Sequence, residues 1–549
     1  MTSFGPARSA PGTATSALAK DEVRADDWRA ILLTALIASL AWATAHSIAF
    51  PNLDRYHDML ESFAWSQTFE WGSFKHPPFF AWVTGLWFSV FPRSDWFFKL
   101  LAYANVAVGL LGVAALARHL GKPLHARAAI VLLMCCLPYT TLAAKFNANS
   151  QLLSIWPWAA CALIASLNAA RSAASTVQAW AWSTALGLLC AAAMLAKYYS
   201  GVLLVTLFVV ALMHSSARSW FASPHPWWAL AVTLFALTPH ALWLRQSEFA
   251  MLGYALDQGG GAIDWRNVLA FLLIPFLYWM PGWLLCAAFF ARKTEAIGSS
   301  RWALFLRNLG RAWQARGPGD YLFWLAVLPW LISLAFGITG VVALSVPWAI
   351  PLGFAFPLLW LRNLQDQAGA RDSEAAIRAL THAPAGLAVL GLVMLGASAL
   401  AWHQAMRGTP EYYRPTENAA RAILAEWEQR HPGLRLGWSG GEWPLNAMMG
   451  FYADPSIRAL PGMPDSQEAR LAPHPAWRSQ GGVLICSADL TDACNRAARE
   501  WLIANRAEVL PRELRIRRHG WRFPAPGDWS YVIYDVLPSE STLSLIHIS

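Results

Sequence analysis

The stretch of this sequence whose residue types could most readily perform chemistry is DRYHDMLESFAW, residues 54–65. It lies in a chain in which only 14% of the residues are charged. Asp54, Asp58 and Glu61 follow one another at i, i+4 and i+7, so a helix here would carry all three carboxyl groups on one face. The apolar residues between them fall on another face, which predicts a helix lying at a membrane surface with its acids toward the protein. A surface helix whose acids merely face water has the same pattern, so the spacing alone leaves both possibilities open.

A cation and an imidazole follow these acids within a short distance, in the segment WGSFKHPPFFAW. Lys75 and His76 precede two prolines, and a proline disfavours helix at the residue before it, so we expect the chain to turn here. Transporters more often keep ionisable groups inside their spans, near the midplane of the bilayer. Ionisable groups gathered in a loop therefore favour a catalytic site over a transport path.

The composition indicates the kind of protein that positions this loop. Of the 549 residues, 56% are hydrophobic and 32 are tryptophan, whereas a soluble protein carries about a quarter charged residues. Tryptophan is enriched at the membrane–water interface. The sequence thus predicts an α-helical multi-pass membrane protein. The formal net charge of +9 lies in loops where membrane topology requires it, so no nucleic-acid partner is expected.

About eleven apolar segments are long enough to predict transmembrane helices. They are 30–49, 97–117, 127–144, 150–168, 176–195, 199–214, 226–244, 267–291, 320–337, 340–361 and 384–402. The basic connections all fall on one side, and by the positive-inside rule that side is cytoplasmic.

This topology makes residues 1–28 a disordered cytoplasmic tail and 29–402 a transmembrane domain. The loop 50–96 and everything after 402 then lie outside the cytoplasm, and we expect the chain in a bacterial cytoplasmic (inner) membrane.

The C-terminal part, residues 403–540, is polar and predicts a small extracytoplasmic α/β domain. Strand-like runs in LRLGW, GGVLICSA and WSYVIYDV alternate with two helical patterns. Its WSGGEW segment lacks the glycine spacing of a nucleotide site. A disulfide between Cys486 and Cys494 suits this compartment, but the sequence does not fix their geometry. Residues 541–549 are interpreted as a non-native tail and excluded.

The segment YHDMLESFAWSQTFEWGSFKHPPFFAW, residues 56–82, resembles the first extracytoplasmic loop of the GT-C glycosyltransferases of family 39. That family includes protein O-mannosyltransferases and bacterial aminoarabinose lipid A transferases, and the resemblance implies a GT-C type bundle. Aligning AWSQ and HPP puts the family's catalytic aspartate on Asp58. In the second loop, KFNANS, Asn149 stands where many members carry an acidic motif. Two departures are that Glu61 is not adjacent to Asp58 and that Lys75 replaces the acid often preceding HPP.

The resemblance implies transfer of a sugar, with inversion, from a polyprenyl-phosphate carrier to a lipid such as lipid A, a glycan or a protein. A lipid-linked donor also follows from the topology, because nucleotide sugars are cytoplasmic. Asp58 is the candidate base. Glu61 would orient the acceptor or share a divalent cation, Mg²⁺ or Mn²⁺, with Asp58, and no metal is required by the pattern. Asp54 is the reserve candidate.

Three lysines are candidates for the carrier phosphate: Lys75, Lys145 and Lys197. Lys197 equally fits a lysine that snorkels to the interface, and Tyr198 and Tyr199 stand beside it. Further substrate contacts are expected from His76, Asn147 and Asn149, although the asparagines could instead cap the next span. A transporter or flippase of a lipid-linked sugar, and an inactive GT-C scaffold, are the alternative functions.

Overall fold

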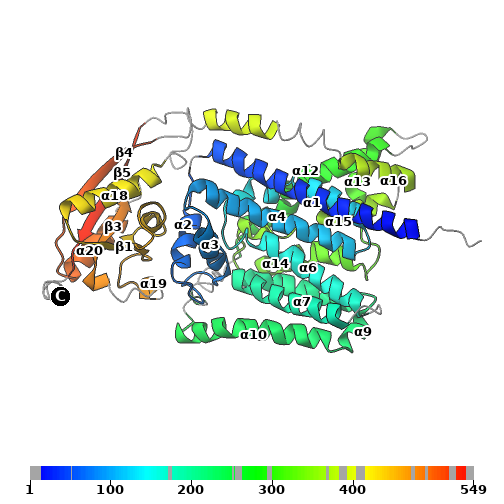
Figure 1. Ribbon diagram of the computed structural model, residues 1–549, viewed down its shortest axis with the longest axis horizontal. Helices are drawn as coiled ribbons and strands as arrows, with labels where there is room; N and C mark the ends of the chain where they lie inside the picture. The colour runs from blue at the N-terminus through cyan, green and yellow to red at the C-terminus, as the bar shows by residue number, and fades with distance from the viewer. Residues whose placement is uncertain are drawn as a thin grey trace, which may run out of the picture.

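The computed structural model consists of a helical bundle with a small sheet domain at one end (Figure 1). It describes residues 14–50, 52–170, 176–249, 251, 253, 263–293, 300–366, 370–381, 392–403, 414–470, 477–488, 493–518 and 527–538. Within these residues, seven helices are long and apolar enough to cross a membrane, and a bent helix pair raises the number to eight. The prediction of a multi-pass α-helical membrane protein with a small C-terminal α/β domain is confirmed.

The seven long helices are α1 (Ala14–Ala49), α4 (Asp95–His119), α6 (Leu152–Ala169), α7 (Thr176–Ala196), α10 (His225–Gln246), α12 (Trp265–Lys293) and α14 (Tyr321–Ile338). The bent pair consists of α5 (Pro123–Leu133) followed by the 3-10 turns η1 (Leu137–Tyr139) and η2 (Leu142–Ala144). The chain bends by 86° at the break between α5 and η1. Shorter helices around the bundle are η3 (Tyr198–Ser200), α8 (Gly201–Met213), α9 (Ala217–Phe221), α13 (Arg301–Arg311), η4 (Val346–Ala349), α15 (Phe356–Gln365) and α16 (Ala370–Leu380).

The expected number of about eleven continuous spans is too high for the described residues. The segment 340–361 is broken into η4 and α15, and Pro351, which lacks the N–H that a continuous helix needs, lies between them. The segment 199–214 forms only the short apolar helix α8. Of the segment 384–402, the structure describes residues from 392 onward. The apolar pattern located these segments correctly but did not predict their breaks.

The expected disorder of residues 1–28 does not hold for residues 14–28, because α1 begins at Ala14. Residues 1–13 and the proposed non-native tail, 541–549, lie outside the described residues.

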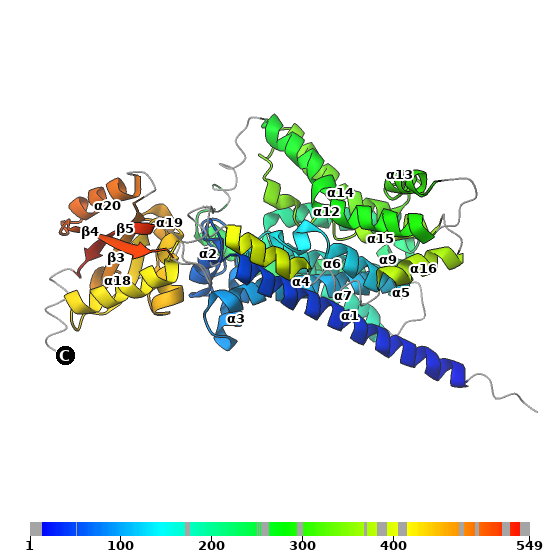
Figure 2. The ribbon, with the colours of Figure 1, turned by 90° about the horizontal axis from the view of Figure 1, so that it is seen from above.

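Two helices of the first loop, α2 (Asp58–Ser66) and α3 (Phe79–Val90), lie between the bundle and the sheet domain (Figures 1 and 2). Met59, Leu60 and Phe63 of α2 share one apolar core with Phe451 and with sheet residues such as Ile485. The apolar face predicted for 54–65 therefore packs against the C-terminal domain rather than only against lipid.

The C-terminal domain is built on a five-stranded sheet of order β2-β1-β3-β5-β4, in which β1 is parallel to β2 and β3, and β5 is antiparallel to its neighbours. Its elements are α18 (Thr416–Arg430), β1 (Leu436–Gly441), η6 (Leu445–Ala447), the π-helix η7 (Met449–Ala453), β2 (Arg458–Ala459), α19 (Gln467–Arg470), η8 (Trp477–Ser479), β3 (Gly481–Ser487), α20 (Ala493–Ala504), β4 (Pro511–Arg517) and β5 (Asp528–Val536).

Helices α18 and α20 cover opposite faces of this sheet (Figure 2). Alternate residues of β3 explain this, because Val483 and Ile485 join the core of α18 while Leu484 and Cys486 join that of α20. A disulfide joins Cys486 to Cys494, so the pairing that the sequence left open is formed.

Polar contacts fix the sheet domain on the bundle. The Tyr452 hydroxyl donates to Asp95 Oδ1 at 2.6 Å, at the start of α4. Gln67 Nε2, just after α2, donates to the carbonyl oxygens of Pro455 and Ile457, each at 3.1 Å. The domain therefore contacts both a membrane helix and the acidic loop.

Candidate active site

Asp54 acts as the cap of helix α2. Its carboxylate accepts hydrogen bonds from the backbone N–H groups of Tyr56 at 3.0 Å, Asp58 at 3.1 Å and Met59 at 2.9 Å. The N–H groups of Asp58 and Met59 are among those that a helix N-terminus leaves without partners. Asp54 thus holds Asp58 in the first turn of α2. The four-residue spacing between the two acids follows from this capping contact.

Asp58 is held by two residues of the KFNANS loop. Lys145 Nζ lies 2.7 Å from Asp58 Oδ2, and Asn147 Nδ2 donates to the same oxygen at 3.0 Å. Burial by itself raises the pKa of Asp58, but Lys145, Asn147 and Lys75 together outweigh burial and hold that pKa below its ordinary value. About a quarter of the side chain, 24%, remains exposed. Asp58 is therefore an ionised carboxylate that solvent or a substrate can reach.

Glu61 lies one turn further along α2 and is only 2% exposed. Lys75 Nζ contacts both of its oxygens, at 3.0 and 3.2 Å, and Trp443 Nε1 donates to Oε1 at 2.9 Å. Burial raises the pKa of Glu61 to about 7, although Lys75 and Trp443 oppose this shift. The structure thus pairs Glu61 with Lys75, whereas the sequence analysis assigned Lys75 to the carrier phosphate, and it adds a residue from the C-terminal domain.

The KFNANS turn connects Asp58 to the end of α7. Asn147 Oδ1 accepts from the backbone N–H groups of Asn149 at 3.0 Å and Ser150 at 3.1 Å, which fixes the turn before α6. Lys197 Nζ donates to Asn149 Oδ1 at 2.5 Å and lies 5.1 Å from the ring centre of Trp348. Both expected asparagines therefore shape the site through their side chains.

Lys197 is the cation that the site leaves without an acidic partner. Among the described residues, no carboxylate lies within ion-pair distance of its Nζ, and its residue is 9% exposed. Burial, and then the charge of Lys75, lower the pKa of Lys197 to about 7, while Asp58 opposes the shift. An anion bound beside Lys197 would therefore stabilise its charged form.

The other predicted substrate residues have protein partners. His240 Nδ1 lies 2.5 Å from the carbonyl oxygen of Trp71, so Nδ1 carries the proton of the neutral ring. His240 Nε2 is then an acceptor, and the Tyr198 hydroxyl donates to it at 2.6 Å. The hydroxyls of Tyr199 and Ser333 lie 2.6 Å apart. His76 packs edge-on against aromatic rings, and burial, then Lys197 and Lys75, hold its pKa well below its usual range, so the imidazole is neutral.

Two contributions come from residues that the sequence analysis did not select. Trp443, in the WSGGEW segment, reaches Glu61 across 382 positions of the chain. His57, with a positive φ of 59°, accepts from Arg414 Nη1 at 2.7 Å. Burial and then Arg414 lower the pKa of His57 to about 3, so its ring is neutral. No local pattern indicates either contact, since each depends on how the sheet domain docks.

The acids do not form a ligand set for a divalent cation. Within the described part of the chain, no three His, Cys, Asp or Glu side chains converge. Asp58 and Glu61 instead form ion pairs with Lys145 and Lys75, respectively. These residues therefore do not fit a metal shared between the two carboxylates.

Comparisons with known proteins identify similar folds. The family model described as dolichyl-phosphate-mannose-protein mannosyltransferase matches residues 75–243. No curated protein matches the chain. The crystal structure of ArnT from Cupriavidus metallidurans bound to undecaprenyl phosphate superposes with a TM-score of 0.53 at 15% identity, covering 91% of this chain and 98% of that one. The apo structure of the same protein gives 0.53 and 15%, covering 90% and 97%.

The chain has the GT-C glycosyltransferase fold. The resemblance drawn from residues 56–82 is confirmed at the level of the fold, and the match to ArnT extends over nearly the whole chain. These likenesses establish the fold of this chain, that of a multi-pass membrane protein.

Proposed function

We propose that this GT-C protein moves a sugar, with inversion, from a polyprenyl-phosphate carrier to an acceptor on the extracytoplasmic face. One observation carries the proposal: an ionised Asp58 lies beside Lys145 at the same end of the bundle as Lys75 and Lys197. An inverting displacement of phosphate needs a carboxylate for the acceptor and cations for the leaving group. The undecaprenyl phosphate bound in the similar ArnT structure supports a donor of this chemical class.

Asp58 takes the proton in this mechanism. The acceptor oxygen attacks the anomeric carbon, the bond from that carbon to the phosphate oxygen breaks, and the acceptor proton passes to Asp58. A lowered pKa makes Asp58 a weak base. The acceptor oxygen becomes strongly acidic only as its new bond forms, so a weak base suffices if the proton moves late. Lys145 and Asn147 keep the carboxylate oriented.

The leaving phosphate keeps the electron pair of the broken bond and gains negative charge. Lys197 is the group we assign to this charge, because the structure gives its ammonium an amide acceptor and no carboxylate among the described residues. Lys75 contributes from the other side while bound to Glu61. Lysine meets phosphate as a point charge and tolerates small differences in geometry.

The acceptor is a lipid such as lipid A, a glycan or a protein. Its group would enter next to Asp58, where Glu61, Lys75 and Trp443 form the adjoining wall. Glu61 therefore acts as a positioning residue in this proposal.

Asp58→Asn in membrane vesicles tests the proposal against the transporter alternative. The variant should lose transfer by about 100-fold or more, the scale of a missing general base, yet still bind the lipid-linked donor. Asp264→Asn is the matched control, because Asp264 is an exposed acid that only caps the start of α12.

Retained transfer in Asp58→Asn would refute the role of Asp58. If the unmodified protein transfers no sugar in vesicles and Asp58→Asn loses donor translocation, the protein is a carrier. If the unmodified protein binds the donor but neither transfers nor translocates it, the protein is a scaffold. Incubating purified protein with a panel of polyprenyl-phosphate sugars, followed by mass spectrometry of the products, identifies donor and acceptor.

A further inference from the structure

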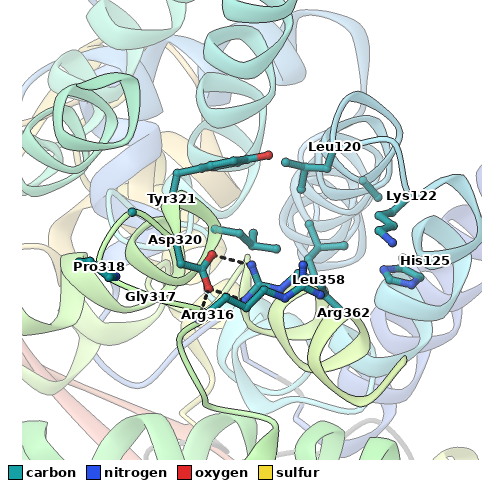
Figure 3. A pocket seen from close by; sticks show the side chains of 13 residues that line it. Leu120, Lys122, His125, Arg316, Gly317, Pro318, Asp320, Tyr321, Leu358 and Arg362 are labelled. Carbon is teal, nitrogen blue, oxygen red and sulfur yellow. Dashed lines mark hydrogen bonds and ion pairs between the residues drawn. The ribbon is translucent and has the colours of Figure 1, made fainter. Parts of the chain in front are cut away.

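A polar cavity lies at the end of the bundle that is remote from the acidic loop. Its volume is about 480 Å³, and it is enclosed by the end of α4, the start of α5, the loop leading into α14, and α15. Figure 3 shows Lys122 and His125 on one wall and Asp320 and Tyr321 on the facing wall.

The cavity is separate from the candidate active site. Helix α4 connects the two regions, because Asp95 at its start bonds the sheet domain while Ala117 near its end lines the cavity. Its 25 residues span ~37 Å at 1.5 Å per residue. The two regions are therefore separated along α4 by more than the thickness of a bilayer's hydrocarbon core, which is about 30 Å.

One ion pair forms the polar floor of the cavity. Arg362 donates from Nη1 and Nη2 to the two oxygens of Asp320 at 2.5 and 2.6 Å, and both side chains are at least nine-tenths buried. Asp320 also accepts from the backbone N–H groups of Arg316 at 2.9 Å and Phe323 at 3.2 Å. The single lining carboxylate is therefore fully used, and it holds the wall of the cavity in place.

Of the remaining polar groups, His125 Nε2 lies 2.8 Å from Gln365 Oε1, whereas Lys122 and Tyr321 are donors without a protein acceptor among the described residues. Among the described residues, Lys122 has no carboxylate within ion-pair distance, and the Tyr321 hydroxyl makes no hydrogen bond. The Arg316 side chain also borders the cavity, paired with Asp366. Three cations thus line the cavity, and because Arg362 pairs with Asp320 and Arg316 with Asp366, Lys122 is the one without a carboxylate partner among the described residues. An anion that accepts several hydrogen bonds complements this lining.

Apolar side chains complete the walls. Leu120 and Leu358 stand between the polar groups in Figure 3. Pockets of roughly 300–1,000 Å³ hold ligands much larger than a phosphate ion. A ligand that combines an anionic group with an apolar portion would complement these walls.

We propose that this cavity binds the phosphate-bearing headgroup of an anionic membrane lipid. Lys122 and Tyr321 donate to the phosphate oxygens, the Arg362–Asp320 pair holds the floor in place, and Leu120 and Leu358 contact the glycerol and the first acyl carbons. Basic pockets between helices on the cytoplasmic side suit such headgroups, because anionic lipids are enriched there. The basic connections at this end of the bundle fit the same side.

Purified full-length protein in detergent tests this site. Phosphatidylglycerol, phosphatidylcholine and inorganic phosphate are titrated separately, with thermal unfolding and native mass spectrometry as readouts. We expect phosphatidylglycerol to raise the unfolding temperature and to remain bound, whereas phosphatidylcholine and inorganic phosphate have little effect.

Three variants make the assignment specific. Lys122→Gln should weaken phosphatidylglycerol binding by about tenfold, the scale of one charge-assisted hydrogen bond, and Lys122→Arg should restore it. Arg218→Gln, at an exposed arginine near the same end but outside the cavity, is the matched control and should bind normally.

Three results would overturn the proposal. They are equal binding by Lys122→Gln and the unmodified protein, equal weakening by Arg218→Gln, and stabilisation by inorganic phosphate that matches the effect of the lipid. The last result would assign the cavity to a soluble phosphate compound. None of these outcomes depends on transferase activity, so they do not bear on the proposed function.

Discussion

The hydrogen bond from Trp443 to Glu61 predicts that the sheet domain sets the protonation state of a residue in the membrane loop. Burial raises the pKa of Glu61 from its ordinary 4.5 to about 7, a shift that corresponds to about 3 kcal/mol. A hydrogen bond to a charged group contributes about 1.5–3 kcal/mol. Trp443→Phe removes this donor from the ionised carboxylate and should raise the pKa of Glu61 by about 1–2 further units.

The expected result is a displaced pH profile. In the proposed mechanism, ionised Glu61 holds Lys75 in place, so activity should rise with pH as Glu61 loses its proton. At pH 7.5 roughly three quarters of the unmodified protein has ionised Glu61, against about a tenth or less once the pKa exceeds about 8.5. Trp443→Phe should therefore lose several-fold activity at pH 7.5 and recover near pH 9.5.

Trp65→Phe is the matched control. Trp65 stacks on Trp443 with ring centres 5.9 Å apart, and its Nε1 has no hydrogen-bond partner among the described residues. This change removes an indole N–H from the same stack without touching Glu61. A profile that stays in place in Trp443→Phe, or that moves equally in Trp65→Phe, would refute the reasoning.

Three further predictions concern the same elements. Glu61→Gln should flatten the dependence of the unfolding temperature on pH. Because burial raises the pKa of Glu61 in the folded protein to about 7, its contribution to stability is present below about pH 4.5 and is lost as the pH rises through 7. An unchanged slope between pH 5 and 8 would contradict this. Lys145→Met removes the cation that lowers the pKa of Asp58, so the acid limb of the transfer profile should move to higher pH, and a limb that stays or falls would disprove the pairing. Cys494→Ser opens a disulfide between residues 8 positions apart, which should cost the sheet domain about 2.5 kcal/mol on chain-entropy grounds, measured as a lower unfolding temperature that reductant no longer changes.

Local patterns predicted much of the fold, with identifiable exceptions. Apolar runs such as 176–195 gave the membrane helices closely, because hydrophobic length is a local property. The segment 340–361 did not form a continuous helix, because hydropathy does not register the prolines that interrupt it. The strands of the C-terminal domain were recognised from their composition, whereas their order β2-β1-β3-β5-β4 depends on long-range pairing.

The sequence by itself determined the acidic helix. The spacing of Asp54, Asp58 and Glu61 is a property of one short segment, and capping by Asp54 is likewise local. Only the tertiary structure decided which groups face these acids. Lys145 meets Asp58 because α4, α5 and α6 pack together, and Trp443 meets Glu61 because the sheet domain shares a core with α2. Such contacts between distant segments arise from burial of apolar faces, and no spacing along the chain encodes them.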